Sequence, residues 1–344
     1  MSDPTNPTNP TDPVAPNLVA GRTTPSASML DVQEASGATP EAALLAAPLD
    51  DGAPARSLWS DAWEIMRRSP LFWIASTLIV ILLTMTVFPG LFTGKDPSRC
   101  VLDLARQGPS GDAIFGYDIQ GCDVYAQTIY GARASILVGV STTLLVTLVG
   151  VALGTLGGYV GGWLDALLSR IADMVFAIPL LLGAIVAMTT VFRTLPGAPY
   201  FVVVGKVVVV LALLSWPSIY RLMRSSVLQV KPAEYVLAAR ALGSKTLRLV
   251  LNHVIPNAIA PVIVVATIDL GAYIATEATL SFLGIGLQPP AISWGIAISD
   301  ASSLGYVRTA PHMLLFPSLF LSVTVLSFIM LGEVVREAID PKLR

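Results

Sequence analysis

The chain has 344 residues, of which 54% are hydrophobic and only 13% are charged, and its formal net charge is −2. An ordinary soluble domain carries about 25% charged residues, so this composition excludes a water-covered globular surface and indicates a membrane protein. The small net charge and the scattered basic residues argue against a nucleic-acid partner.

The first 56 residues are rich in Pro, Thr, Ala and Asp and poor in aromatic residues. This composition predicts a disordered tail over residues 1–56, which is either an inert leader or a docking segment. The stretch SLWSDAWEIMRR then repeats apolar residues at helical spacing. We therefore expect a helix in the membrane interface over residues 57–70.

Long uncharged runs follow, and about 20 apolar residues are enough to cross the hydrocarbon core of a bilayer. Two of the runs are broken only by ionisable residues, one by Lys206 and the other by Asp269 and Glu277. A polytopic all-α membrane domain is therefore predicted over residues 71–344. Its six expected spans are 71–93, 134–157, 172–192, 199–220, 258–283 and 310–334.

Lys and Arg residues concentrate in the segments that become cytoplasmic if the N-terminus lies inside the cell. Because short cytoplasmic loops retain basic residues, both termini and the segment 231–257 are expected in the cytoplasm, and the loop 94–131 outside. Cys100 and Cys122 both fall in this outer loop, where an oxidising compartment favours a disulfide. Two unrelated thiols are the alternative, and without a nearby histidine no metal site is expected.

Four glycines in and after the second span recur at intervals of four residues and so share one helical stripe: Gly150, Gly154, Gly158 and Gly162. Such a stripe lets a second helix approach closely. It serves either static packing or a face that slides during a transport cycle. Pro179 and Pro217 are expected to kink the third and fourth spans.

Ionisable residues inside a membrane usually face the interior of a helix bundle and pair with one another. Lys206 and Glu277 lie at matching depths in the fourth and fifth spans, so we predict an ion pair between them. The pair is interpreted as a structural lock, with direct contact to a transported substrate as the alternative. Asp269 lies deeper and is expected to be protonated or to face a watery path.

The segment EYVLAARALGSKTLRLVLNHVIPN interrupts these apolar runs with charges. Pro232 suits a first helical turn and Gly243 suits a C-terminal cap, so a short helix is predicted over Pro232 to Leu242. Ser244 is expected to cap a second helix that runs to Pro256. Two short helices that lead into a span form a lever. A partner protein is expected to hold the small-residue surface of this lever, which Glu234 and Arg240 orient.

This segment resembles the EAA loop of bacterial ATP-binding-cassette (ABC) importer permeases. The motif positions are occupied by Ala238, Ala239, Gly243, Ile255 and Pro256. Leu237 stands where the name-giving Glu is expected, and Glu234, one turn earlier, is interpreted as its substitute. The resemblance implies that the segment couples the membrane domain to an ATPase.

Three further segments resemble the C-type permease of dipeptide, oligopeptide and nickel importers: FGYDIQGCDVYAQTIYGARASILVG, EATLSFLGIGLQPPAISWG and LGEVVREAIDPKLR. The resemblance implies a six-helix type I importer permease with a cytoplasmic coupling helix, located in the bacterial plasma membrane. The implied partners are a homologous B-type permease, two ABC ATPases and an extracytoplasmic peptide-binding protein. ATP and Mg²⁺ are used by the ATPases, and this chain is expected to bind no cofactor and to catalyse no reaction.

The sequence gives less support to other functional interpretations. The stretch GLFTGKD is one residue too short between its glycines for a phosphate-binding loop. A membrane enzyme would need facing acids or a histidine, whereas Asp269 and Glu277 are eight residues apart on one predicted helix. Nickel chelates or glutathione-like peptides are alternative cargoes, and a self-sufficient channel or secondary transporter is an alternative class.

Overall fold

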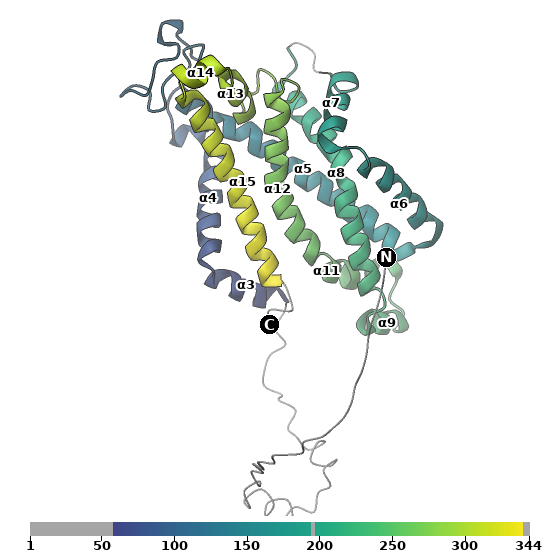
Figure 1. Cartoon of the computed structure of the whole chain (residues 1–344). Helices are drawn as coiled ribbons and strands as arrows, with labels where there is room; N and C mark the ends of the chain where they lie inside the picture. Colours follow the sequence, from purple (N-terminus) through teal and green to yellow (C-terminus); the bar gives the residue numbers. More distant parts are fainter. Residues whose placement is uncertain (1–57, 194–196, 340–344) are drawn as a thin grey trace, which may run out of the picture. The chain divides into compact units, whose positions relative to one another are not determined.

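The computed structural model describes residues 58–193 and 197–339 (Figure 1). The predicted tail, 1–56, lies outside the described residues. The described residues form helices joined by loops. The helices are α3 Leu58–Arg68, α4 Pro70–Val87, α5 Val124–Val160, α6 Gly162–Phe176, α7 Leu180–Thr190, α8 Tyr200–Val230, α9 Glu234–Ala241, α10 Thr246–Leu249, a π-helix Val250–Val254, α11 Ile255–Ala258, α12 Ala260–Phe282, α13 Trp294–Ala301, α14 Leu304–Thr309 and α15 His312–Ile339.

Within the described ranges, five helices are long and apolar enough to cross a membrane. They are α4, α5, α8, α12 and α15, and α6 together with α7 makes a sixth if that bent pair is one span. These helices coincide with the six apolar runs of the sequence. The protein is therefore a multi-pass, all-α membrane protein.

The second membrane helix is longer than its apolar run. Helix α5 begins at Val124, ten residues before the predicted span, and the outer loop therefore ends at 123. Asp123 caps the helix by accepting a hydrogen bond from the Ala126 amide at 3.1 Å. Arg133, within the added turns, donates to the Thr86 carbonyl of α4 at 3.2 Å. The apolar run marks the part of the helix suited to lipid, whereas the cap marks where the helix begins.

The third predicted span is not a single straight helix. The chain forms α6 and α7, whose axes are bent by 85°. Pro179 lies at the break, because it occupies the N-cap position of α7. Pro217, in contrast, lies inside α8, which continues through it. Of the two prolines, Pro179 therefore interrupts a helix and Pro217 does not.

The hydrophobic core follows α8 along both of its halves. In the first half, Val207 and Leu211 are fully buried against α5 and α7. In the second half, Met223 and Val227 are buried against residues of α9 and α12. Helix α8 thus connects α7 at one end of the bundle to α9 at the other (Figure 1).

The glycine stripe of α5 packs on α8, as expected for three of its four members. A Cβ atom on Gly150 would lie 2.6 Å from Ile219, and one on Gly154 would lie 2.7 Å from the Tyr220 carbonyl oxygen. Gly158 is similarly close to α8. Gly162 is different, because α5 ends at Val160 and Gly162 opens α6 with a φ of +66° and with no atom within 4 Å of an added Cβ. The stripe therefore ends with α5.

Replacing Gly154 by Ala should destabilise this seam by roughly 1–3 kcal/mol, because the neighbouring atoms include backbone of α8 that cannot move aside. Gly205→Ala is the matched control, since Gly205 lies in α8 with no atom within 4 Å of an added Cβ. Thermal unfolding in detergent measures both. Equal stability of the two variants would show that α5 and α8 are not in tight contact.

Candidate functional site

The segment after α8 folds into the short helix α9, which ends at a glycine-dependent turn. Helix α9 runs from Glu234 to Ala241, two residues later than the predicted start. Gly243 has a φ of +82°, and its amide donates to the Arg240 carbonyl at 3.0 Å. Only glycine adopts this backbone conformation without strain, which accounts for the cap predicted at this position.

The second helix of the segment differs from the prediction at both ends. Lys245, rather than Ser244, occupies the N-cap of α10, and no side chain caps this helix. The chain then continues through the π-helix into α11, where Pro256 lies in the first turn instead of ending the helix. Proline is tolerated there because a first-turn amide has no partner within its own helix. The segment therefore reaches α12 with only Ile259 between the two helices.

Helix α9 is tied to the bundle by Val236 and Ala239, which pack in one apolar cluster, and by Tyr159 of α5. Val236 is fully buried in a cluster that includes Met223 of α8. Arg240 donates to the Tyr159 hydroxyl at 3.1 Å, and Lys231 donates to the Tyr159 carbonyl at 2.7 Å. Both cations also lie near the Tyr159 ring, at 6.0 and 5.5 Å from its centre. Helix α9 is therefore held to the ends of α5 and α8.

The remaining face of this segment is exposed and unusually apolar. We define the α9 surface as the exposed side chains of Tyr235, Leu237, Leu242, Leu247 and Leu251, together with Ala238. Leu242 is 88% exposed. The charged residues Glu234, Arg240, Lys245 and Arg248 surround it and are also exposed, whereas Ala239 is half-buried. Several large exposed apolar side chains on one short segment, with charged residues among them, are typical of a protein-binding site.

The predicted ion pair between Lys206 and Glu277 is wrong. Lys206 donates a hydrogen bond to the Arg193 carbonyl at 2.9 Å. Glu277 is fully buried, and its Oε1 accepts a hydrogen bond from Ser281 Oγ at 2.7 Å. Matching depth in the membrane does not determine which side of a helix a residue faces, and these two side chains have separate partners.

Glu277 instead belongs to a buried polar cluster at the end of α12. The Ser281 hydroxyl, which donates to Glu277, accepts a hydrogen bond from the Leu287 amide at 2.9 Å. Trp294 of α13 is also fully buried, and its indole donates to the Thr128 carbonyl of α5 at 2.9 Å. This cluster, to which Glu277 contributes an acceptor, holds the turn after α12 in place, and Trp294 ties the following α13 to α5.

Asp269 lies apart from this cluster, near the middle of α12. It is half-buried and lines an open cleft of about 350 Å³ beside the bend between α6 and α7. The structure therefore separates the three intramembrane ionisable residues into three different environments.

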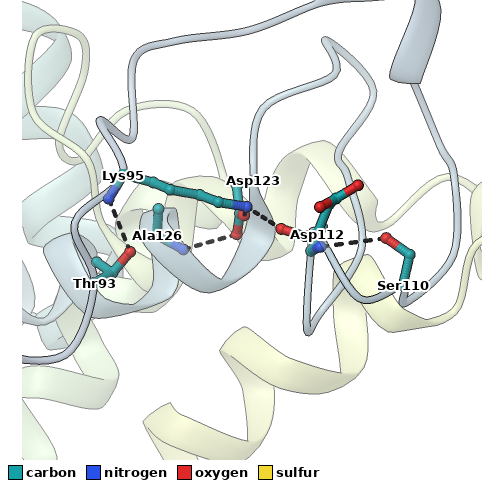
Figure 2. A network of polar contacts seen from close by, with 7 residues as sticks. Thr93, Lys95, Ser110, Asp112, Asp123 and Ala126 are labelled. Carbon is teal, nitrogen blue, oxygen red and sulfur yellow. Dashed lines mark hydrogen bonds and ion pairs between the residues drawn. The ribbon is translucent and has the colours of Figure 1, made fainter.

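The outer loop is held against the start of α5 by a disulfide and an ion pair. Cys100 and Cys122 form the disulfide, 22 residues apart, which stabilises such a loop by roughly 3 kcal/mol in the chain-entropy model. Figure 2 shows Lys95, whose Nζ lies 2.7 Å from Asp123 Oδ2 and also donates to the Asp112 carbonyl. The hydrogen bond from Lys95 to Asp123 raises the pKa of Lys95 above its ordinary value of 10.5.

Sequence reasoning missed Tyr159, Lys95 and Asp123. Asp123 carries the only local signal, because Asp is a common N-cap residue. The partners of Lys95 and Tyr159 are far away in the sequence, so no spacing rule links them to these residues.

Neutralising Lys95 should weaken the folded outer loop in a pH-dependent way. Because the pKa of Lys95 is higher in the folded protein, its contribution to stability is complete below about pH 10 and is lost as the pH rises through the folded-state pKa. Lys95→Met should therefore lower the unfolding temperature at pH 8 and lose this effect in strong alkali. A double-mutant cycle with Asp123→Asn measures the pair, and additive effects of the two substitutions would argue against it.

Replacing Glu277 by Ala should lower the free energy of unfolding by about 2 kcal/mol or more, because the Ser281 hydroxyl loses its acceptor and a cavity is left. Glu277→Gln retains both the volume and the acceptor and should be much milder. Thermal unfolding in detergent compares the two variants. Equal destabilisation by Gln and Ala would contradict the assignment of a purely structural hydrogen bond.

Two family descriptions match this chain. The binding-protein-dependent transport system inner membrane component matches residues 150–344 and therefore includes α9, α12 and Asp269. The N-terminal TM domain of oligopeptide transport permease C matches residues 57–109, which include α3, α4 and the start of the outer loop.

Individual relatives cover most of the chain. It is 38% identical over 288 residues to the oligopeptide transport system permease protein OppC of Bacillus subtilis, covering 84% of this chain and 91% of the relative. It is 33% identical to the dipeptide transport system permease protein DppC of Alkalihalophilus pseudofirmus, over 86% of this chain and 94% of the relative. It is also 33% identical to the glutathione transport system permease protein GsiD of Pectobacterium atrosepticum, over 84% and 93%.

These matches confirm the resemblance inferred from the EAA loop and the three C-type segments. With its exposed α9 surface leading directly into the membrane helices, the chain belongs to the family of binding-protein-dependent transport system inner membrane components.

Proposed function

We propose that this chain forms half of the translocation pore of an ATP-driven peptide importer in the bacterial plasma membrane. Its relatives OppC and DppC are named as permeases of oligopeptide and dipeptide transport systems, which supports a peptide as cargo. The other half of the pore is a homologous B-type permease. Two ABC ATPases bind and hydrolyse ATP with Mg²⁺, and an extracytoplasmic binding protein delivers the peptide.

The observation that carries this proposal is the α9 surface. It is exposed and apolar, charged residues lie beside it, and α9 is held to the bundle by other side chains, namely the buried Val236 and Arg240, which donates to Tyr159. A partner that seats the exposed face can therefore move α9 without breaking its contacts to the bundle. The ATPase subunit is the partner that the family membership implies.

The coupling step follows from how the segment is connected. When the ATPases close on ATP, each pulls its bound coupling helix inward. In this chain α9 transmits that movement to α5 through Tyr159 and to α12 through α10, the π-helix and α11. The two permease halves then tilt, and the pore opens alternately to the two sides of the membrane.

The orientation in this proposal rests on the distribution of Lys and Arg in the sequence. The α9 segment and both termini lie on the cytoplasmic side, because the basic residues are concentrated there. The disulfide between Cys100 and Cys122 supports this orientation, since such bonds persist outside the cytoplasm. The relationship to GsiD makes glutathione-like peptides the second candidate cargo.

Ala238→Arg should abolish ATP-driven peptide uptake while the protein still folds and inserts. The Ala238 side chain is exposed in the free chain, so a larger residue disturbs no internal contact but blocks close approach of a partner. Uptake by the complex in proteoliposomes and the amount of ATPase that copurifies measure the effect. Ala238→Ser, which keeps the side chain small, is the matched control and should retain both properties.

Full uptake by the Ala238→Arg variant would show that α9 is not the ATPase contact. A loss of uptake with unchanged ATPase copurification would place the coupling contact elsewhere on the α9 surface.

A further inference from the structure

The bend between α6 and α7 opens a cleft on the membrane-spanning part of the bundle. The cleft has a volume of about 350 Å³, within the range of small-molecule sites. Three elements line it: the bend itself with Phe176 and Pro179, helix α8 with Ser218, and helix α12 with Asp269 and Thr276. In Figure 1 the three elements lie beside one another in the order α12, α8 and the α6–α7 pair.

Asp269 is the one charged residue among the described residues that line this cleft. Within residues 58–193 and 197–339, no hydrogen bond or ion pair to its carboxylate is formed. A cation near the rim is already engaged elsewhere, because Arg221 lies 2.7 Å from Asp173 and 4.1 Å from the centre of the Phe176 ring. The carboxylate of Asp269 is thus available to a ligand from outside the chain.

The position of Asp269 limits what the cleft can face. It lies near the middle of α12, a helix long enough to cross the membrane. A carboxylate at that depth is strongly disfavoured in contact with lipid, so the cleft must open to water or to another subunit in the assembled transporter. In the proposed importer, the water-filled path between the two permease halves meets this requirement.

The chemistry of the cleft selects a positively charged organic group. A single carboxylate is a poor site for a metal ion, which takes several anionic or carbonyl ligands, and no group of three or more His, Cys, Asp and Glu residues able to hold one occurs in the described ranges. An ammonium group, in contrast, is satisfied by one carboxylate and a few hydroxyl acceptors. The hydroxyls of Ser218 and Thr276 supply those acceptors, and the apolar wall of the bend supplies a surface for an attached carbon chain.

We propose that the cleft around Asp269 is a cargo subsite that binds a primary ammonium group as the substrate passes through the pore. This inference rests on the proposed function for the nature of the cargo. The ammonium comes either from the amino terminus of the peptide or from a lysine side chain within it. Both sources present the same group to the carboxylate.

The first test examines the cleft without requiring transport. The chain has two cysteines, which are bonded to each other, so Ser218→Cys places a single free thiol on the cleft wall. In the assembled complex, the rate at which this thiol reacts with the cationic reagent 2-aminoethyl methanethiosulfonate is compared with its rate for the anionic sulfonatoethyl analogue. After both rates are divided by the intrinsic reactivities of the reagents, the cationic reagent should react about tenfold faster. Adding Asp269→Asn should remove this preference, whereas adding Asp103→Asn, at an exposed position in the outer loop, should leave it intact.

The second test measures cargo selection in proteoliposomes that contain the complete importer. Uptake of a tripeptide with a free amino terminus should fall about tenfold in Asp269→Asn, and uptake of its N-acetylated form should not change. Each rate is normalised to the measured affinity of the binding protein for that peptide. An N-acetylated peptide that carries lysine separates the two sources, because only side-chain recognition would make its uptake depend on Asp269.

Several results would overturn the subsite. Equal reagent preference with and without Asp269, or unchanged selection in Asp269→Asn, would show that the carboxylate does not attract the cargo. Loss of the B-type permease from the purified Asp269→Asn complex would assign the carboxylate to an ion pair between subunits instead. If the wild-type complex itself shows no ATP-driven uptake, the proposed function fails, and the reagent preference still reports on the cleft.

Discussion

The burial of Val236 against α8 is the interaction on which the short helix α9 depends. Helix α9 has only two turns, and an isolated helix of that length is not stable in water. Its structure therefore comes from the burial of Val236 in the cluster that includes Met223 and from the hydrogen bond of Arg240 to Tyr159. Because one face of α9 is committed to the bundle in this way, the other face can present exposed leucines to a partner. A coupling helix needs both properties, and a helix this short obtains them only by packing.

The ionisable residues of the membrane helices show how surroundings divide similar side chains between structural and functional roles. Glu277 is enclosed by α5, α13 and the turn after α12, and its hydrogen bond to Ser281 helps to hold that turn. Asp269 lies about two turns earlier on the same helix but lines a cleft that the α6–α7 bend has opened. A bilayer penalises both residues, so each persists for a reason. Packing supplies that reason for Glu277, and the proposed cargo subsite supplies it for Asp269.

Rigid and mobile parts of the chain are expected to follow from the same contacts. The glycines of α5 bring α8 so close that the two helices form one unit, and the disulfide with the Lys95–Asp123 pair fixes the outer loop to the start of α5. The bend at Pro179 and the turn at Gly243 lie between such units. Tilting of the permease during transport is therefore expected to leave the α5–α8 seam intact and to change the angles at these two places.

Much of this molecule followed from local sequence patterns. The apolar runs located the five helices long enough to cross a membrane and the bent α6–α7 pair, the turn at Gly243 was indicated by the need for a positive φ, and the EAA-like segment identified the family. Each of these signals depends on neighbouring residues, either through the length of an apolar run or through the conformational freedom of one residue. Such signals can be read without knowing which helices are neighbours.

The partners of individual side chains could not be found in this way. The sequence placed Lys206 and Glu277 at the same depth but did not show that they face different neighbours, and it did not connect Tyr159 to Arg240. Pro179 indicated a kink, but not a bend of 85° that leaves Asp269 beside a cleft. Periodicity and composition thus determined by themselves which stretches of the chain form long apolar helices, but not where each helix begins and ends. Only the tertiary structure decided what each polar side chain contacts, because that depends on the rotation and crossing of helices that lie far apart in the chain.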